Sequence, residues 1–371
     1  MKICIISGTF PPVRCGVGDY ASLLADHLAA EANEVNIITT KYAKVNTQSK
    51  IKIYPIINTW HLFSLNNLFK QIVSLNPEVV HLQYPTASYG RGLAPNLIFF
   101  MLRCFCPKIK CVLTLHEYAI FSILGKIRLS PLILAAHKIL CTNHNDRRKI
   151  RDFHPKSRAK VKVLPLASNI NILKITNISK QELKAGLVHF GTVMPNKGWE
   201  NILMAWKILI EENCKLKLLV LGELQPDKYA YHKQIEKLIE KYGLNKYIKF
   251  TGYLKPEEVS NKLSKAQIAI QPYTQGASLN RSSLIAVLVH GLAVITTKSD
   301  INLEGLKAGQ HFLAIPKDDP KALAEIIKKL IGDPKQVKLL QQEAGKKLTR
   351  FNWDKIIQRL TRIYHEELSK I

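Results

Sequence analysis

Short apolar runs alternate with longer amphipathic segments along almost the whole chain. The short runs have the length of strands and end in glycine, proline or polar residues, whereas the longer segments carry apolar residues at helical spacing. In the first half we predict strands at residues 2–7, 34–39, 52–56, 79–83, 111–116, 138–143 and 161–166, and helices at residues 17–31 and 63–76. Strands that alternate with helices form parallel sheets, because each return to the sheet needs a crossover.

The same pattern restarts in the second half. We predict strands at residues 187–193, 217–223, 247–253, 267–273, 293–297 and 311–315, and helices at residues 200–213, 228–243, 256–266, from about Leu279 and at 319–333. The predicted fold class is therefore α/β, with two Rossmann-like doubly wound domains that face one another across a cleft at the carboxyl ends of their strands.

A polar stretch with few apolar residues separates the two halves. The predicted organisation is an N-terminal Rossmann-like domain over residues 1–170, a linker over 171–186, a C-terminal Rossmann-like domain over 187–350 and an amphipathic helix over 351–371.

The chain is strongly basic, and this charge favours anionic partners. Of its 371 residues, 54 are Lys or Arg and 28 are Asp or Glu, which gives a formal net charge of +26. Both halves share the excess, and its densest cluster lies at residues 147–162. Membrane surfaces, nucleic acid and phosphorylated ligands all attract such a chain. We do not expect nucleic acid, because the sequence has neither interleaved aromatic residues for base stacking nor a recognised binding motif.

The sequence predicts contact with a membrane from one side only. No run reaches the ~18 uncharged apolar residues that span a bilayer, since Arg103, Lys126 and Arg128 interrupt the most apolar segments. Residues 103–138 interleave basic residues with Phe, Ile and Leu, which fits a surface lying on an anionic membrane or two ordinary core helices with solvated ends. The first apolar run is too short for a signal peptide.

The cysteines indicate a reducing compartment. Seven is an odd number, and Cys104, Cys106 and Cys111 lack the C-x-x-C spacing and the nearby histidines of a zinc site. We interpret all seven as reduced thiols, and we expect a cytoplasmic protein that is peripheral on the inner face of the cell membrane.

Candidate ligand contacts in the first half follow its strands. Gly16 and Gly18 precede a helix start, where a backbone without side chains can approach an anion, although such a turn is often only structural. His116 and Glu117 end a strand, where a histidine can bind a sugar hydroxyl or be satisfied by the backbone. His81 has the same ambiguity and favours a structural role.

Two loops in the second half favour phosphate. Gly191 ends a strand, and the following loop brings Lys197 and Gly198 to the start of a helix. Residues 273–291, YTQGASLNRSSLIAVLVHG, combine a glycine turn with hydroxyl groups and an arginine at another helix start. Because a helix N-terminus is itself partly positive, Arg281 is favourable there only if an anion lies between them.

The order of these segments resembles a known family. CGVGDYASLLA, LHEY, FGTVMPNKGWENILMAW, VLGE, YIKFTGYLKPEEVSNKLSKAQIAIQPY and SLNRSSLIAVLVHGLAVITT are similar to segments of the retaining, nucleotide-sugar-dependent glycosyltransferases of the GT-B fold, in the family 4 group. The resemblance is nearly end to end and is most specific in the second half.

The resemblance implies a role for each matching residue. The donor-binding residues would be Gly16, Gly18, Gly191, Lys197, Gly198, Tyr253, Leu254, Gly276, Ser278, Arg281, Ser282 and Ser283. Among them, Lys197 would bind the diphosphate, and the backbone at Tyr253 and Leu254 would hold the base. His116 would touch the transferred sugar near its anomeric centre, and Asp19 is a candidate contact to the acceptor. The N-terminal domain would be the acceptor side and the C-terminal domain the donor domain, and the closing helix over 351–371 would cross back to the N-terminal domain.

The resemblance also implies the chemistry. A sugar would pass from a nucleotide-sugar donor to a glycan or lipid-linked acceptor with retention, by a front-face route without a covalent protein intermediate, in cell-envelope polysaccharide or glycolipid synthesis. The protein would supply positioning and stabilise the departing diphosphate. It would need no cofactor and no metal, and the sequence contains no Asp-x-Asp pair.

The sequence departs from the family pattern at the donor helix. Family members usually carry two glutamates with seven residues between them. If this chain is aligned back from Gly291, those positions hold Ser278 and Ala286. If it is aligned forward from Gln275 and Gly276, they hold Gln275 and Ser283. The arginine that often follows the first glycine is also missing, because Thr192 follows Gly191.

Three interpretations remain open. Arg281 and its neighbouring serines can replace the missing contacts in an active enzyme of a divergent subgroup. Alternatively, the chain is a catalytically silent GT-B domain that binds a glycan or a partner, or another two-domain enzyme of this architecture, such as an epimerase of nucleotide sugars or a phosphorylase.

Overall fold

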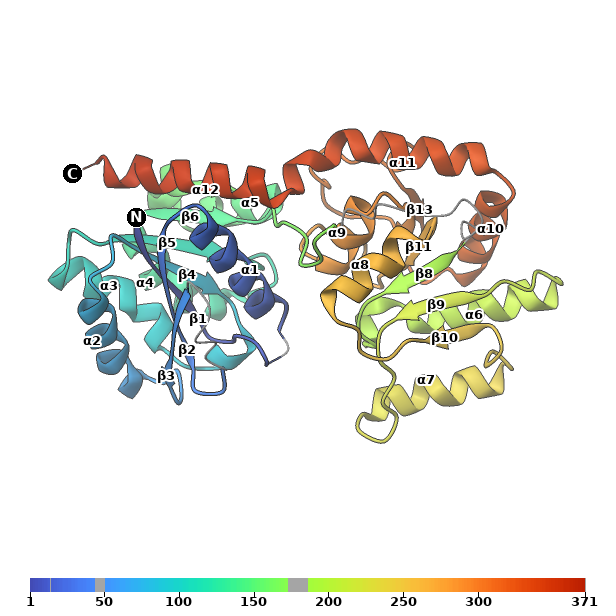
Figure 1. The fold of residues 1–371 in the computed structure, drawn as a ribbon, viewed down its shortest axis with the longest axis horizontal. Coiled ribbons are helices and arrows are strands. Elements are labelled where there is room, and N and C mark those ends of the chain that lie inside the picture. The colour runs from blue at the N-terminus through green and yellow to red at the C-terminus, as the bar shows by residue number, and fades with distance from the viewer. Residues whose placement is uncertain (14, 44–50, 173–185, 371) are drawn as a thin grey trace. The chain divides into compact units, whose positions relative to one another are not determined.

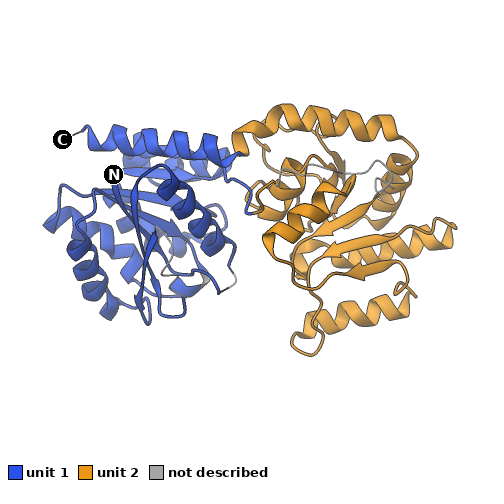
Figure 2. Cartoon of the chain, viewed as in Figure 1, with its two compact units in different colours: residues 1–169, 352–371 blue, residues 170–351 orange. Residues whose placement is uncertain are grey.

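The chain forms two compact units, each with its own parallel sheet. A computed structural model describes residues 1–13, 15–43, 51–172 and 186–370. Unit 1 comprises residues 1–169 and 352–371, and unit 2 comprises residues 170–351 (Figure 2). The predicted α/β class with two doubly wound domains is confirmed. Most of the predicted linker falls at residues 173–185, outside the described residues.

The sheet of unit 1 has seven strands in the order β3-β2-β1-β4-β5-β6-β7 (Figure 1). Its neighbouring strands all pair in parallel. Their bounds are β1 Lys2–Ser7, β2 Glu34–Thr40, β3 Ile51–Ile57, β4 Val79–Tyr84, β5 Lys110–Leu115, β6 Lys138–Cys141 and β7 Val161–Val163. The order reverses between β1 and β4, and doubly wound sheets bind ligands at the carboxyl end of such a reversal.

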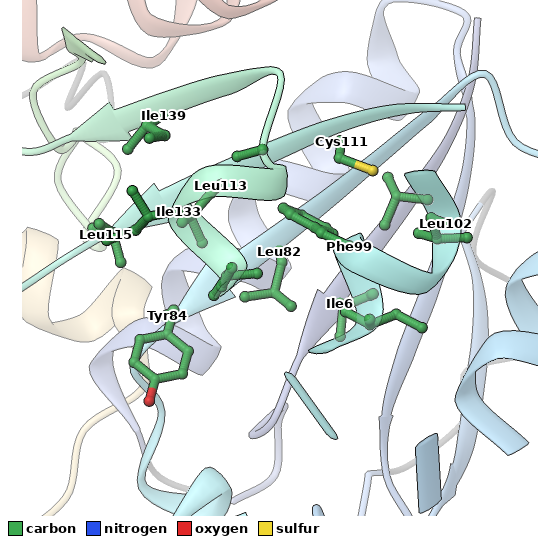
Figure 3. Close-up of a cluster of buried hydrophobic side chains, with 14 of the residues drawn as sticks. Ile6, Leu82, Tyr84, Phe99, Leu102, Cys111, Leu113, Leu115, Ile133 and Ile139 are labelled. Carbon is green, nitrogen blue, oxygen red and sulfur yellow. The ribbon is translucent and has the colours of Figure 1, made fainter. Parts of the chain in front are cut away.

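Helices cover both faces of this sheet. Their bounds are α1 Gly16–Ala30, α2 Leu65–Leu75, α3 Ala94–Phe105, α4 Ile123–Ala135, α5 His144–Phe153 and α12 Trp353–Leu368, with 3₁₀ turns η1 Leu62–Ser64, η2 Ala87–Tyr89 and η3 Pro155–Lys160. The helices α2 to α5 pack on one face, where Phe99 and Leu102 of α3 and Ile133 of α4 meet Leu82 and Leu113 of the strands (Figure 3). Helices α1 and α12 pack on the other face.

Helix α12 completes the core of unit 1 although it follows unit 2 in the sequence. Its buried residues include Trp353, Ile356, Leu360 and Tyr364. Burial of each large apolar side chain stabilises a fold by about 1.5–3 kcal/mol. Glu367 adds a buried ion pair with Lys138 of β6, at 2.8 Å. The helix is therefore an integral layer of unit 1.

The sheet of unit 2 has six strands in the order β10-β9-β8-β11-β12-β13, again with all neighbouring pairs parallel. Their bounds are β8 Leu187–Phe190, β9 Leu218–Leu221, β10 Ile248–Phe250, β11 Ile268–Gln271, β12 Ala293–Thr297 and β13 Leu313–Ile315. The central pair β8 and β11 leads directly into the two loops that the sequence predicts to bind phosphate.

The helices of unit 2 form its core with this sheet. Their bounds are η5 Pro195–Lys197, α6 Trp199–Glu211, α7 Ala230–Lys241, α8 Pro256–Ser264, α9 Ser282–Val289, α10 Pro320–Ile331, α11 Pro334–Leu348 and η6 Thr349–Phe351. The main cluster joins the strands to buried residues of α6, α7, α10 and α11, with Trp199 and Trp206 fully buried.

Two helix predictions need correction in unit 2. Helix α9 begins at Ser282 rather than near Leu279, because Arg281 has extended backbone and its N–H bonds the Ser278 carbonyl in a turn. Helix α11 was not predicted. Its apolar residues are spread among lysines and glutamines, so the apolar stripe is weak in the sequence, and Asp333 caps the helix start by accepting from the Gln336 N–H.

Candidate active site

Unit 2 brings the residues of its two predicted phosphate loops into contact. Lys197 lies at the end of η5 after β8, and Ser283 lies in the first turn of α9 after β11. The Lys197 Nζ donates to the Ser283 Oγ at 3.4 Å, and the Ser283 hydroxyl shares a 2.9 Å hydrogen bond with the Tyr273 hydroxyl. An ammonium and a hydroxyl thus meet at the N-terminus of α9, where the first N–H groups have no intrahelical partner.

Two cations lie over the aromatic ring of Tyr273. The Arg281 guanidinium lies 4.4 Å from the ring centroid and the Lys197 Nζ lies 5.2 Å from it. Arg281 also donates to the Gln275 Oε1 at 3.3 Å. Tyr273 was not among the site residues predicted from the sequence. Its only sequence signal was its place at the end of a strand, directly before the glycine turn.

The two cations affect each other's protonation. Burial, and then the positive charge of Arg281, lower the pKa of Lys197 to about 8. A phosphate between the two cations would remove this repulsion and raise the pKa again. Lys197 and Arg281 together therefore favour the binding of an anion.

A buried histidine adds an uncharged nitrogen beside these groups. His189 of β8 donates from Nδ1 to the Ile270 carbonyl at 2.8 Å, while its Nε2 is buried with no hydrogen-bond partner among the described residues. A Cβ built on Gly191 would lie 3.7 Å from the Ser283 Oγ, 3.8 Å from the His189 Nε2 and 3.8 Å from the Lys197 Cε. Burial lowers the pKa of His189 to about 4, so its ring is neutral. Within its strand, His189 could not be distinguished from a core residue.

Close backbone packing explains why two residues of the predicted donor site are glycines. Gly198 has φ of +73°, and a Cβ there would lie 1.9 Å from the Pro272 carbonyl oxygen. Gly276 has φ of +83°, and its Cβ would lie 2.6 Å from the Lys298 carbonyl oxygen. Gly198 thus lets the loop after β8 approach the loop after β11, and Gly276 lets the loop after β11 approach the segment after β12.

The remaining donor candidates of unit 2 border this cluster or follow another strand. Ser282 is the first residue of α9, and the Ser278 hydroxyl accepts from the Asn280 N–H at 3.2 Å in the turn before it. Tyr253 and Leu254 lie after β10, at the edge of the sheet, and the Tyr253 side chain is exposed.

The positions of the missing glutamates carry no carboxylate in either register. Gln275 and Ser283 both lie at the cluster, where they contact Arg281 and Lys197. In the other register, Ser278 lies in the preceding turn and Ala286 is fully buried in α9.

In unit 1, α1 begins at Gly16, directly after a turn that follows β1. A Cβ on Gly18 would lie 2.7 Å from the Thr9 carbonyl oxygen, so this glycine lets α1 pack on the turn. A Cβ on Gly16 would meet nothing within 4 Å. Asp19 lies in the first turn of α1, and although the residue is exposed, partial burial of its carboxyl raises the pKa of Asp19 to about 6.

His116 ends a chain of buried hydrogen bonds that crosses unit 1. Its Nε2 lies 2.9 Å from the Gln83 Oε1, the Gln83 Nε2 lies 3.1 Å from the His81 Nε2, and the His81 Nδ1 lies 2.6 Å from the Tyr364 hydroxyl of α12. Burial lowers the pKa of His116 to about 3, so the ring is neutral near pH 7. An amide oxygen can only accept, which assigns the His116 proton to Nε2 and leaves Nδ1 as an acceptor.

The described residues contain no group of three or more His, Cys, Asp or Glu side chains that could hold a metal ion. All seven cysteines are free thiols. No helix in the described ranges is long and apolar enough to cross a membrane.

Two family models account for most of the chain. The model described as glycosyl transferases group 1 matches residues 174–347, and the model described as Glycosyltransferase Family 4 matches residues 15–170. Together with the two parallel sheets, these matches show that the chain belongs to the family 4 glycosyltransferases, which have the GT-B fold.

Solved structures share this fold over the full length. A glycosyltransferase from Rickettsia africae superposes with a TM-score of 0.78 and 15% identity, covering 100% of this chain and 99% of that one. Sucrose-phosphate synthase from Thermosynechococcus elongatus gives 0.76 and 17%, covering 100% of both chains. Anabaena HepE in complex with UDP gives 0.77 and 14%, covering 99% of this chain and 100% of that one.

Among curated proteins, the D-inositol 3-phosphate glycosyltransferase of Corynebacterium urealyticum is 24% identical over 188 residues. The match covers 49% of this chain and 43% of the relative, so it spans less than half the length of either protein.

Proposed function

We propose that this chain transfers a sugar from a nucleotide-sugar donor to a glycan or lipid-linked acceptor, with retention and without a metal, in cell-envelope polysaccharide or glycolipid synthesis. The main support is the cluster of Lys197, Arg281, Ser283 and Tyr273 at the start of α9. Two cations, a hydroxyl pair and a helix N-terminus are the groups that stabilise a departing diphosphate when no metal carries the charge.

The same cluster suggests how this chain works without the family's glutamates, as a divergent subgroup. Lys197 would bind one phosphate and Arg281 the other, while Ser278, Ser282, Ser283 and the first N–H groups of α9 supply neutral donors. Gly191, Gly198 and Gly276 would let the diphosphate approach the backbone, and Tyr253 and Leu254 would border the base.

Unit 1 would contribute the contacts to the reacting sugar and the acceptor. Because His116 is neutral with an acceptor at Nδ1, we infer that it accepts a hydrogen bond from a sugar hydroxyl rather than supplying positive charge. Gly16 and Gly18 would let the donor approach the start of α1, and Asp19 would bind an acceptor hydroxyl.

A donor screen tests the proposal. Uridine nucleotide sugars come first, because HepE, which shares this fold, has been solved with UDP and with UDP-glucose. Thermal shift identifies donors that bind, and release of the nucleoside diphosphate then measures transfer in the wild type, Lys197→Ala and Arg281→Ala. We expect each substitution to weaken donor binding about tenfold or more, because each removes a charge-assisted contact. Lys233→Ala, which removes an exposed lysine of α7, is the matched control.

The outcomes separate the alternatives. Donor stabilisation that both substitutions leave intact contradicts the assigned phosphate site. Donor binding without release of nucleoside diphosphate, for any acceptor fraction tried, supports the catalytically silent GT-B domain instead, which the missing glutamates favour.

We also propose that unit 1 binds the inner face of the cell membrane, so that the enzyme is cytoplasmic and peripheral. The support is the start of α4, where Ile123 and Leu124 are 68% and 78% exposed and Ile120 and Ile127 are exposed beside them. Lys126 lies among them, as in a surface that rests on anionic lipid. The opposite side of α4 is core, with Leu129, Leu132 and Ile133 buried.

Sedimentation with liposomes that contain anionic lipid tests this surface. We expect wild type to co-sediment at low salt, and Leu124→Gln with Ile127→Gln to lose most of the binding. Leu339→Gln on α11, which removes a similarly exposed leucine from unit 2, should bind as wild type does. Equal sedimentation of all three proteins would contradict the proposal.

A further inference from the structure

A second basic site lies in unit 1, apart from the residues assigned to the donor. A cavity of about 330 Å³ is lined by His144, Arg147, Arg148, Arg151, Asp152 and Arg158. This volume is at the lower end of the roughly 300–1,000 Å³ found for ligand pockets. We call it the arginine pocket. All of its lining residues except His144 fall within residues 147–162, the densest basic cluster of the sequence.

Helical spacing gathers these side chains on one face. His144, Arg147, Arg148 and Arg151 follow the i, i+3, i+4, i+7 pattern on α5, so they share one side of the helix. Arg158 returns to this side from η3, where its Nε donates to the Arg151 carbonyl at 3.0 Å. Two consecutive elements therefore aim four guanidinium groups at one cavity.

The positive charge of the pocket is not neutralised within the described part of the chain. The four arginines form no ion pair there, and Asp152 is the single carboxylate in the lining. Among the described residues, the Arg148 guanidinium donates to the neutral Asn145 Oδ1, at 3.4 Å. The Arg147 Nε is buried and has no hydrogen-bond partner among the described residues. A buried guanidinium nitrogen without a partner is costly unless a ligand satisfies it.

The opposite side of α5 is fixed to the loop that follows His116. Asn143 caps the helix by accepting from the Asp146 N–H at 2.8 Å, and the buried Asp146 carboxylate accepts from the Ala119 N–H at 2.7 Å. Lys149 donates to the Ala119 carbonyl at 3.4 Å. The arginine pocket therefore lies on the side of α5 that faces away from this loop.

We propose that the arginine pocket binds a phosphomonoester or diphosphate group carried by the acceptor. Guanidinium groups arranged as forks match the paired oxygens of phosphate, and three or more of them favour the higher charge of a monoester or diphosphate over a diester. Assignment of this group to the acceptor rests on the proposed transfer reaction. The proposal that the pocket binds phosphate does not depend on that reaction.

Arginine modification by phenylglyoxal, mapped by peptide mass spectrometry, tests the pocket residue by residue. We expect inorganic pyrophosphate to protect Arg147, Arg148 and Arg151 of the full-length protein. Protection of Arg281 in the same experiment reports the donor site separately, so failure at one site is distinguishable from failure at the other. No protection of the α5 arginines by pyrophosphate would overturn the proposal.

Titration of variants gives an independent measure. In a Lys197→Ala background, which weakens the donor site, Arg147→Gln with Arg151→Gln should reduce affinity for pyrophosphate about tenfold or more. Lys156→Gln, which removes an exposed lysine of η3 outside the lining, should leave it unchanged. An equal loss of pyrophosphate affinity in the double variant and in Lys156→Gln, or no loss in either, would contradict a specific pocket. An unchanged melting temperature of the double variant shows that it is folded.

Vesicles distinguish a lipid source from a soluble one. Phosphatidylcholine vesicles are compared with vesicles that also contain phosphatidic acid, a phosphomonoester, or phosphatidylglycerol, a phosphodiester. Binding that needs phosphatidic acid and is lost in the double variant supports a lipid-borne acceptor. Pyrophosphate binding without this preference supports a soluble phosphorylated acceptor. Equal binding of wild type and double variant to both anionic lipids, together with equal pyrophosphate affinity, would overturn the proposal.

Discussion

Lys197 is the residue whose protonation should control donor binding. Its pKa is lowered to about 8 by burial and by Arg281, so the free protein loses this cation as pH rises through that value. A diphosphate binds the protonated form, and its affinity should therefore be highest below pH 8 and fall above it. Arg281 keeps its charge throughout this range.

Calorimetric titration with UDP from pH 7 to 9.5 measures this effect. We expect affinity to fall progressively above about pH 8 in the wild type. In Lys197→Arg the decline should disappear, because the guanidinium stays protonated. An identical pH profile for both proteins would show that another group controls binding.

Gly198 shows how strongly a single backbone position is constrained beside this site. Gly198→Ala would place a Cβ 1.9 Å from the Pro272 carbonyl oxygen at a positive φ. We expect the free energy of unfolding to fall by more than about 3 kcal/mol, because the clash adds to the backbone strain. Gly243→Ala is a matched control, since its φ is +66° and its Cβ would meet nothing within 4 Å.

Urea denaturation of Gly198→Ala and Gly243→Ala separates the cost of the clash from the cost of the left-handed backbone. The control should lose about 1–2 kcal/mol from the left-handed backbone alone. If Gly198→Ala loses no more than Gly243→Ala, the close approach of the two loops does not constrain the fold.

At the scale of elements, α12 reaches His116 through side chains. Tyr364 of α12, His81 and Gln83 of β4, and His116 after β5 form one buried chain of hydrogen bonds. In this chain each ring nitrogen of His81 has a hydrogen-bond partner, and the Nε2 of His116 has one. Helix α12 is thereby linked to a candidate site residue on its own face of the sheet, where His116 also packs against Tyr20 of α1.

Tyr364→Phe tests this chain. Loss of the hydroxyl leaves the His81 Nδ1 buried without its 2.6 Å partner, and we expect a loss of about 1–3 kcal/mol in stability. Thermal denaturation should show the change, whereas Tyr229→Phe, at a 55% exposed tyrosine of unit 2, should have almost no effect. Equal melting temperatures for the two variants would show that the chain contributes nothing.

The sequence predicted strands better than it predicted the site. All thirteen strands of the described sheets fall within or beside predicted runs, because buried parallel strands are nearly continuous apolar segments. Helix starts were less certain: the hydroxyl-rich turn before Ser282 looks helical until its hydrogen bonds are known. Lys197 and Ser283 were predictable from their loops. Tyr273 and His189 were not, because in the sequence each looks like a core residue and only the fold places it beside Lys197 and Ser283.

At the scale of the whole molecule, the two units have separate hydrophobic cores. The core of unit 2 draws its residues from positions 187–340, and the two clusters of unit 1 include none of them. Lys197, Tyr273, Arg281 and Ser283 all belong to unit 2. The proposed diphosphate contacts of these four residues therefore involve no residue of unit 1.

Residues 170–351 expressed alone should fold and bind UDP. We expect cooperative thermal unfolding by circular dichroism, and UDP affinity that falls when Lys197 is replaced by alanine. Residues 1–169 alone should instead expose the face that α12 covers and bind a hydrophobic dye, and addition of residues 352–371 through a short linker should remove this binding. Non-cooperative unfolding of the 170–351 fragment would contradict separate cores.

The return of α12 to unit 1 also sets an order of events during synthesis. The ribosome makes residues 1–169 first, but Trp353, Ile356 and Leu360, which cover one face of their sheet, emerge only after all of unit 2. Unit 2 can complete its core while the nascent unit 1 still exposes that apolar face. During this interval the older half of the polypeptide is the less finished one, and it is the half on which a chaperone would act.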